Sequence, residues 1–115
     1  MKKFIVFISI LVLVSSVVFA AGARETGEKK LVIGQVFWGL HDSYQQAHQK
    51  ATAAYLKELG INYLPMDGQM KPEAQTAAME DLIARGVDGI ICQAYDQASM
   101  EISIKAAQEA GIPVV

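Results

Sequence analysis

From residue 31 onward, short apolar runs alternate with longer amphipathic stretches, as strands alternate with helices in an α/β protein. The apolar runs lie at 31–37, 61–65, 87–94 and 112–115, and their Val, Ile and Leu residues predict four short strands. The amphipathic stretches predict three helices, at 42–59, at 72–86 and at 97–110.

A glycine marks each return from a predicted helix to a predicted strand. Gly60, Gly86 and Gly111 each precede a β-branched residue, at the position where a left-handed backbone commonly ends a helix. Strands and helices in this order require parallel pairing through right-handed crossovers. The sequence therefore predicts an α/β fold with a doubly wound parallel sheet and helices on both faces.

Each predicted helix has one apolar face that we expect to lie on the sheet. In the first helix this face consists of Tyr44, Ala47, Ala51, Tyr55 and Leu59. In the second helix it consists of Ala78, Met79, Leu82 and Ile83. In the third helix it consists of Ile102, Ala106 and Ala110.

The first 23 residues differ from the rest of the chain. Two lysines precede an apolar run at 4–21, and the small residues at 21–23 predict a secretory signal peptide that is cleaved after Ala23, with cleavage after Ala20 as the second choice. A retained membrane anchor is the alternative, since the run approaches the roughly 20 residues that span a bilayer. Residues 24–30 are polar and predict a flexible leader, so that 31–115 forms one domain in the periplasm.

Composition and motifs exclude several classes of function. The formal net charge of the chain is −2, and losing Lys2 and Lys3 with the signal peptide makes it more negative, so nothing favours nucleic acid as a partner. The single cysteine, Cys92, lies in an apolar run and has no partner for an internal disulfide. Nucleotide, phosphate and nucleophile motifs are absent. We therefore expect neither an enzyme nor a cofactor.

The candidate site follows from the topology, because ligands of doubly wound sheets bind at the carboxyl ends of the strands. The segments after the first three predicted strands supply the aspartates Asp42, Asp67 and Asp96, and the first of them also carries Trp38 and Tyr44. Carboxylates accept hydrogen bonds from hydroxyl groups, and aromatic rings cover the C–H face of a sugar ring. We predict a ligand site at this edge that combines aspartates with the ring of Trp38, Tyr44 or Tyr95, and no metal.

The same residues allow plainer interpretations. Asp42 and Asp96 come just before predicted helices, where an aspartate caps free N–H groups. Asp67 precedes a glycine, which is a common turn pair. His41 and His48 have no third residue at a metal-ligand spacing, so we expect them on the surface or at the rim of the site.

Two segments carry a resemblance to a known family. They are 84–91, which reads Ala-Arg-Gly-Val-Asp-Gly-Ile-Ile, and 106–115, which reads Ala-Ala-Gln-Glu-Ala-Gly-Ile-Pro-Val-Val, with Asp96 between them. The chain from residue 31 to 115 resembles the type I periplasmic sugar-binding proteins, strongly from Asp67 onward. The resemblance implies that a monosaccharide or related polyol is captured between two closing lobes and delivered to the permease of an ABC-type importer in the inner membrane.

The resemblance also bears on the site. In relatives similar to the ribose and galactose receptors, an acidic or amide residue and an aromatic residue after the first strand contact the sugar, as does an aspartate after the third. Asp42, Tyr44 and Asp96 occupy the matching positions, and Trp38 lies where some members have a further aromatic residue. Many ribose-type relatives read Asn-Pro-Phe-Phe where this chain reads His-Asp-Ser-Tyr at 41–44, which leaves the particular sugar open.

Family members continue through the rest of this lobe, a hinge and a second lobe. We therefore interpret 31–115 as the amino-terminal part of an incomplete first lobe, and a companion chain as a possible source of the second. Two alternatives remain. One is a receptor for another small polar ligand, such as a signalling furanose or a chemoattractant. The other is a metal-binding or phosphoacceptor domain that uses Asp42, Asp67 and Asp96, although the first strand lacks the acidic pair that such a site needs.

Overall fold

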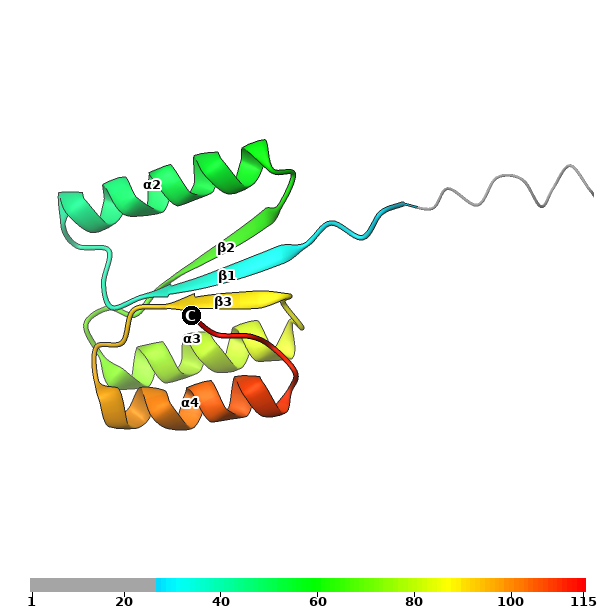
Figure 1. Ribbon diagram of the computed structural model, residues 1–115. Helices are drawn as coiled ribbons and strands as arrows, with labels where there is room; N and C mark the ends of the chain where they lie inside the picture. Colours follow the sequence, from blue (N-terminus) through cyan, green and yellow to red (C-terminus); the bar gives the residue numbers. More distant parts are fainter. Residues whose placement is uncertain (1–26) are drawn as a thin grey trace, which may run out of the picture.

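The computed structural model describes residues 27–115 (Figure 1). The predicted signal peptide 1–23 and the first part of the predicted leader 24–30 lie outside the described residues. Residues 27–30 are exposed and have no regular secondary structure. Within 27–115, no helix is both long enough and apolar enough to cross a membrane.

The centre of the fold is a parallel sheet of three named strands. β1 (Val32–Phe37) lies between β2 (Asn62–Asp67) and β3 (Gly89–Cys92), so the strand order is β2-β1-β3. Along β1, Gly34 is in register with Leu64 of β2 and Ile90 of β3. The central strand is therefore the first in the sequence, and the next two strands are added on its opposite sides.

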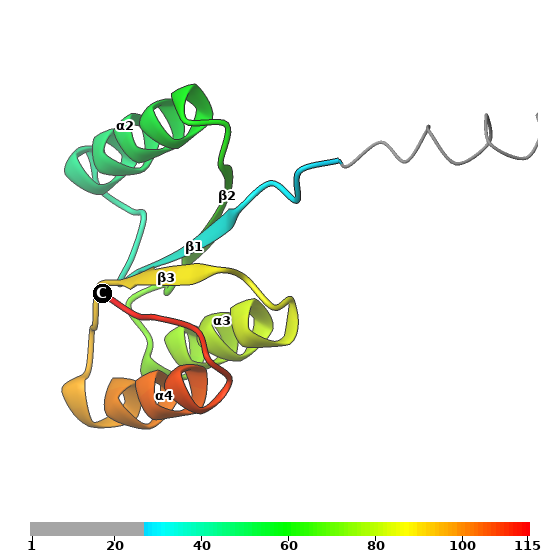
Figure 2. The same ribbon diagram turned by 45° about the vertical axis from the view of Figure 1, so that its right-hand side comes forward.

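The helices cover both faces of the sheet. α2 (Ser43–Glu58) lies over one face, and α3 (Pro72–Ala84) and α4 (Gln97–Glu109) lie side by side on the other (Figures 1 and 2). This arrangement confirms the predicted α/β fold with a doubly wound parallel sheet. The predicted helix ends are confirmed as well, because Gly60, Gly86 and Gly111 have φ angles of 71°, 64° and 77°.

All four predicted strands differ in extent from the structure. The first begins one residue later than predicted, and the third is shortened from 87–94 to Gly89–Cys92. The second begins one residue later than predicted and continues to Asp67, with Pro65 inside it. Proline is tolerated there because β2 is an edge strand among the described residues, so no second neighbour needs its missing N–H. The predicted strand at 112–115 is reduced to a parallel bridge between Val114 and Ile90, on the side of β3 away from β1.

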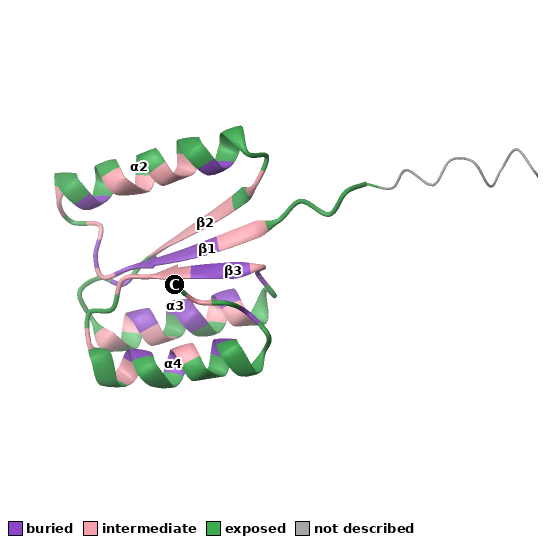
Figure 3. Cartoon of the chain, in the orientation of Figure 1, coloured by how far each residue is buried: buried purple, intermediate pink, exposed green. Residues whose placement is uncertain are grey.

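The hydrophobic core lies between the sheet and the α3–α4 layer (Figure 3). Residues of β1, β3 and both helices are almost completely buried there; they include Val36, Met79, Leu82, Ile90 and Met100. The predicted inward face of α3 is confirmed, since Ala78, Met79 and Leu82 are buried and Ile83 packs against the same cluster. This core fixes α3 and α4 under the sheet.

The predicted inward face of α2 is wrong. Tyr44, Tyr55 and Leu59 are 75%, 63% and 54% exposed, and Ala47 and Ala51 are exposed as well. The stripe that faces the sheet consists instead of Gln45, His48, Thr52 and Leu56. Polar groups at the sheet explain the difference, because the Gln93 side chain hydrogen-bonds to the imidazole of His48.

The predicted inward face of α4 is wrong too. Ile102 is 73% exposed, and Ala106 and Ala110 are also exposed. The helix buries Met100, Ser103 and Ala107 instead, with Ile104 packed against the core. This face carries two large apolar side chains where the predicted face has one, so it removes more apolar surface from water.

Candidate functional site

The three named strands end at the same edge of the sheet, and α2, α3 and α4 begin there (left side of Figure 1). The chain leaves β1 for α2 on one face and leaves β3 for α4 on the other (Figure 2). The strand order reverses at this point. A crevice for ligands is expected where the segments after β1 and β3 separate.

Asp42 lies at this edge as the N-cap of α2. Its Oδ1 accepts a hydrogen bond of 2.8 Å from the backbone N–H of Gln45. Its other oxygen, Oδ2, is 3.7 Å from Nε2 of His41. The carboxylate therefore stabilises the start of α2 and presents its second oxygen toward the segment that follows β1.

Asp96 has the same position at the start of α4. Its Oδ2 accepts a hydrogen bond of 2.8 Å from the backbone N–H of Ser99. This bond is the main reason why the pKa of the Asp96 carboxyl lies below its usual value, and a hydrogen bond with the Ser99 hydroxyl is the second reason. Asp96 is therefore ionised at neutral pH. Capping is confirmed for both aspartates, while their contact with a ligand stays a prediction.

Asp67 joins the segments that follow β1 and β2. Its Oδ1 accepts hydrogen bonds from the backbone N–H of Leu40, at 3.1 Å, and of Gln69, at 2.9 Å. The turn interpretation of Asp67 is confirmed by its bond to Gln69, two residues further on. Its bond to Leu40 was not predicted, and it fixes the path of the chain between β1 and α2.

Backbone hydrogen bonds hold the same two segments together. The N–H of Gly68 donates to the carbonyl of Phe37 at 2.9 Å, and the N–H of Met70 donates to the carbonyl of Trp38 at 2.7 Å. Gln69 and Met70 both have positive φ angles, of 52° and 56°. Such backbone is unfavourable for residues with side chains, and at Met70 it accompanies the bond that holds Trp38.

The two predicted aromatic residues differ in their surroundings. Trp38 is half-buried and meets the ring of His41 edge-to-face, with 4.9 Å between ring centroids and 74° between ring planes. Tyr44, in the first turn of α2, is largely exposed, so it does not belong to the core. Tyr95, which directly precedes Asp96, is also exposed. Aromatic surface is thus available along this edge.

A polar cluster that the sequence did not predict lies under α2. Nε2 of Gln93 is 3.1 Å from Nδ1 of His48, and the His48 ring packs edge-to-face on Phe37 at 5.7 Å. His48 is half-buried, whereas the expected surface position is confirmed for His41, which is exposed. Gln45 is 4% exposed, and its Oε1, like that of Gln93, is buried without a hydrogen-bond donor among residues 27–115.

Gln75 is the second residue that the sequence analysis missed. It is completely buried in α3, and its side-chain amide bonds to backbone groups of Phe37, Gln93 and Tyr95. The signal was present in the sequence, because position 75 lies on the stripe of Ala78, Met79 and Leu82. A polar residue on an apolar stripe indicates a buried hydrogen-bonding role.

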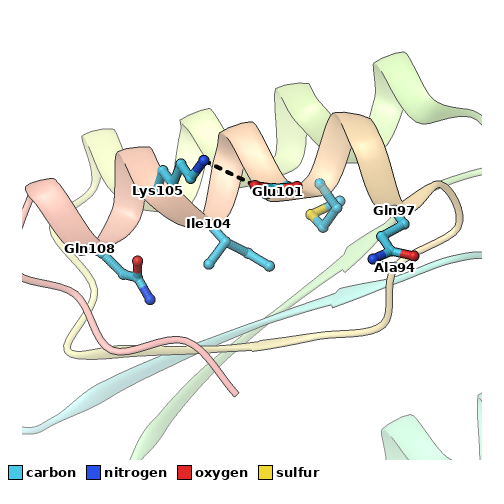
Figure 4. A pocket seen from close by; sticks show the side chains of 7 residues that line it. Ala94, Gln97, Glu101, Ile104, Lys105 and Gln108 are labelled. Carbon is cyan, nitrogen blue, oxygen red and sulfur yellow. Dashed lines mark hydrogen bonds and ion pairs between the residues drawn. The ribbon is translucent and has the colours of Figure 1, made fainter.

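The surface of the described residues has one hollow at this edge of the sheet and others elsewhere. One of about 200 Å³ lies at the edge, between His41, Asp67 and Met70. A groove of about 340 Å³ runs along α4 beside Met100 and Ile104, next to the ion pair of Lys105 with Glu101 at 2.9 Å (Figure 4). A third, of about 390 Å³, is mostly apolar and lies against β3. In the described part of the chain, no three His, Cys, Asp or Glu side chains gather to hold a metal ion.

Comparison with known proteins places these features in context. A family model described as a periplasmic binding protein domain matches residues 33–115. The ribose import binding protein of Bacillus subtilis is 26% identical over 84% of this chain and 32% of its own length. A protein of Rhizobium meliloti named for rhizopine binding is 32% identical over the whole chain and 34% of its own length.

A solved structure gives the same result for the fold. It is the periplasmic binding component of the arabinose ABC transporter from Shewanella sp. ANA-3, bound to arabinofuranose. It superposes with a TM-score of 0.67 at 31% identity, over 72% of this chain and 28% of that protein. The chain thus spans about a third of the length of the relatives that it matches.

Proposed function

Because the chain belongs to the periplasmic binding protein family, we propose that it forms part of one lobe of a receptor that captures a monosaccharide or related polyol. One observation carries the proposal. Asp42 and Asp96 start α2 and α4 at the same edge of the sheet, on opposite faces. Each uses one carboxylate oxygen to cap its helix, which leaves the second oxygen to accept a hydrogen bond from a ligand hydroxyl.

The surroundings of the edge suit a neutral ligand with many hydroxyl groups. The ionised Asp96 only accepts hydrogen bonds, so it suits a ligand hydroxyl group that donates one. The rings of Trp38 and Tyr44 supply apolar faces for the C–H side of a sugar ring. Relatives named for ribose, rhizopine and arabinofuranose support a small ligand of this chemistry.

The mechanism that we propose is capture and delivery without chemical change. The chain is exported by residues 1–23 and acts in the periplasm, where it presents its ligand to the permease of an ABC-type importer. A second lobe, from the same polypeptide or a companion chain, closes over the edge of the sheet and replaces the water around the ligand. Affinity then depends on contacts from both lobes.

The test is thermal unfolding of the full chain, alone and together with a second lobe, in ribose, arabinose, allose, allitol and myo-inositol at 10 mM. A ligand that binds only the folded state raises the midpoint. For a dissociation constant near 1 mM, the stabilisation is about 1.4 kcal/mol, or roughly 6–11 °C in a domain of this size.

The discriminating variant is Asp96→Asn, because asparagine keeps the helix cap but loses the charge. Its midpoint without ligand should stay close to that of the parent, while the ligand-induced rise shrinks. Glu109→Gln is the matched control, since it removes a carboxylate from the opposite end of α4. The proposal is wrong if no sugar or polyol shifts the midpoint in either preparation, or if Asp96→Asn responds as the control does.

A further inference from the structure

We propose that Gln75 is a positioning residue that holds Trp38 and Asp96 in place on the two sides of the ligand edge. The inference deepens the proposed function and rests on it for the identity of the edge as a ligand site. Its physical basis is a single buried amide that joins the ends of two strands where the chain separates toward opposite faces of the sheet.

The geometry accounts for nearly all of the hydrogen-bonding capacity of the amide. Nε2 of Gln75 donates to the carbonyl of Phe37 at 3.1 Å and to the carbonyl of Gln93 at 2.6 Å. Its Oε1 accepts a hydrogen bond of 2.7 Å from the backbone N–H of Tyr95. Both donors and the acceptor oxygen are therefore engaged, and the side chain is completely buried.

The position of these bonds explains why a side chain is needed. The bond from Gln93 N–H to the carbonyl of Val36, at 2.9 Å, is the last backbone bond between the β1 and β3 segments. Beyond it the two segments part toward α2 and α4, so their backbone groups can no longer pair with each other. A buried backbone group without a partner is costly. Gln75 supplies the partners of the Gln93 carbonyl and the Tyr95 N–H, and a second donor to the Phe37 carbonyl, which also accepts from the N–H of Gly68.

Gly68 provides the space for this amide. A Cβ atom at position 68 would lie 2.5 Å from Cγ and 3.1 Å from Nε2 of Gln75, and would also collide with the carbonyl of Phe37. Gly68 is itself buried, so neither neighbour has free volume into which it could move. A glycine at position 68 is therefore needed for the segment after β2 to pack closely against the Gln75 side chain in the first turn of α3.

The consequence for the site follows from chain order. Trp38 directly follows Phe37, and Asp96 directly follows Tyr95. Two predicted ligand residues, one on each side of the crevice, are therefore each one peptide unit away from a group that Gln75 holds. A displacement of the amide changes the separation of both, without any contact between Gln75 and the ligand.

The test compares Gln75→Met and Gln75→Glu with Met79→Ala in the full chain. Met79 is equally buried, one turn later in the same helix, but it packs in the core. Two measurements need no ligand: amide hydrogen exchange at Tyr95, and the fluorescence anisotropy of Trp38, the single tryptophan of the chain. Binding of the sugar that stabilises the parent, or of arabinose if none does, is the third.

In Gln75→Met we expect exchange at Tyr95 to accelerate about ten-fold beyond any change in global stability, as the loss of one hydrogen bond implies. The anisotropy of Trp38 should fall. Gln75→Glu keeps an oxygen that accepts from the Tyr95 N–H, so at neutral pH it should change Tyr95 exchange less than Gln75→Met does. The anisotropy of Trp38 should still fall, because a carboxylate cannot donate to the two carbonyls. It should recover toward the parent at acidic pH, where the protonated acid can donate one bond. Met79→Ala should unfold more easily but show neither local change.

The inference is overturned if Gln75→Met changes Tyr95 exchange and Trp38 anisotropy no more than Met79→Ala does. It is also overturned if Gln75→Glu shows no recovery at acidic pH. If Gln75→Glu does not fold at neutral pH, refolding at acidic pH is the expected result, and failure to refold there counts against the inference. A parent that binds no sugar contradicts the proposed function alone, since both ligand-free measurements still decide the role of Gln75.

Discussion

The contact between β1 and α3 gives the sharpest quantitative prediction for the fold. A Cβ atom at Gly34 would lie 2.6 and 2.7 Å from the two Cδ atoms of Leu82 and 3.1 Å from its Cγ. Leu82 is completely buried in the core, so it has no free space to move into. Gly34→Ala should therefore cost about 1–3 kcal/mol of unfolding free energy, as overpacking of a core does.

The pair can be tested by a double-mutant cycle. Leu82→Ala alone should cost about 2–5 kcal/mol, because it leaves a cavity under the sheet. With alanine at position 82 the clashing atoms are gone, and the new methyl group at position 34 fills part of that cavity. The double variant should therefore be no less stable than Leu82→Ala, which makes the coupling between the two sites about 1–3 kcal/mol.

The assay is urea unfolding of the purified chain followed by far-ultraviolet circular dichroism. Gly89→Ala is the matched control, because it makes the same change in the neighbouring strand. Its Cβ would meet the end of the Ile33 side chain at 3.1 Å and Pro113 only at ordinary contact distances of 3.8 and 3.9 Å. That variant should stay within about 1 kcal/mol of the parent. Additive effects of Gly34→Ala and Leu82→Ala, within about 0.5 kcal/mol, would refute the reasoning.

Three further predictions concern single side chains. Burial raises the pKa of Tyr63 from 10.0 to about 12, so spectroscopic titration at 295 nm should show one of the four tyrosines ionising last. Because the folded pKa lies above the unfolded one, the contribution of Tyr63 to stability is complete below pH 10 and is lost as the pH rises to about 12. Asp67→Ala should lower stability by about 1–2 kcal/mol, since it removes the acceptor for two backbone N–H groups, whereas Asp67→Asn keeps an oxygen there and should cost less in the same urea assay. Burial also raises the pKa of the Cys92 thiol, so an aromatic disulfide reagent at pH 8 should react with it more slowly in the folded chain than in urea; equal rates would contradict this.

The sequence predicted the topology because the signals for it are local and repeated. Three glycines end the helices, and alternating apolar runs place the strands, so the order of elements leaves only the doubly wound sheet. The inward faces of α2 and α4 were missed for a different reason. On each of these helices two stripes have the same helical spacing, and only the partner surface decides between them, as the bond of Gln93 to His48 does for α2.

The positions of Asp42 and Asp96 could be predicted because parallel strands bring their carboxyl ends to one edge, and their capping role follows from the residues after them. Their contact with a ligand stays a prediction. For Gln75 the sequence indicates a buried hydrogen-bonding residue, but not the groups to which it bonds. Its three backbone partners lie 18 to 38 positions away, and only the folded chain brings them to the side chain.

In the proposed receptor, Asp42 and Asp96 would each cap a helix and accept a hydrogen bond from the ligand, and this double role would restrict how the ligand can change over evolution. Only Asp, Asn, Ser, Thr and, to a lesser degree, Gly cap a helix well, and other replacements cost about 1 kcal/mol before any effect on binding. Trp38 and Tyr44 do not cap a helix, so this restriction does not apply to them. Divergence in specificity should therefore begin at the aromatic positions, and positions 42 and 96 should exchange only among short polar residues.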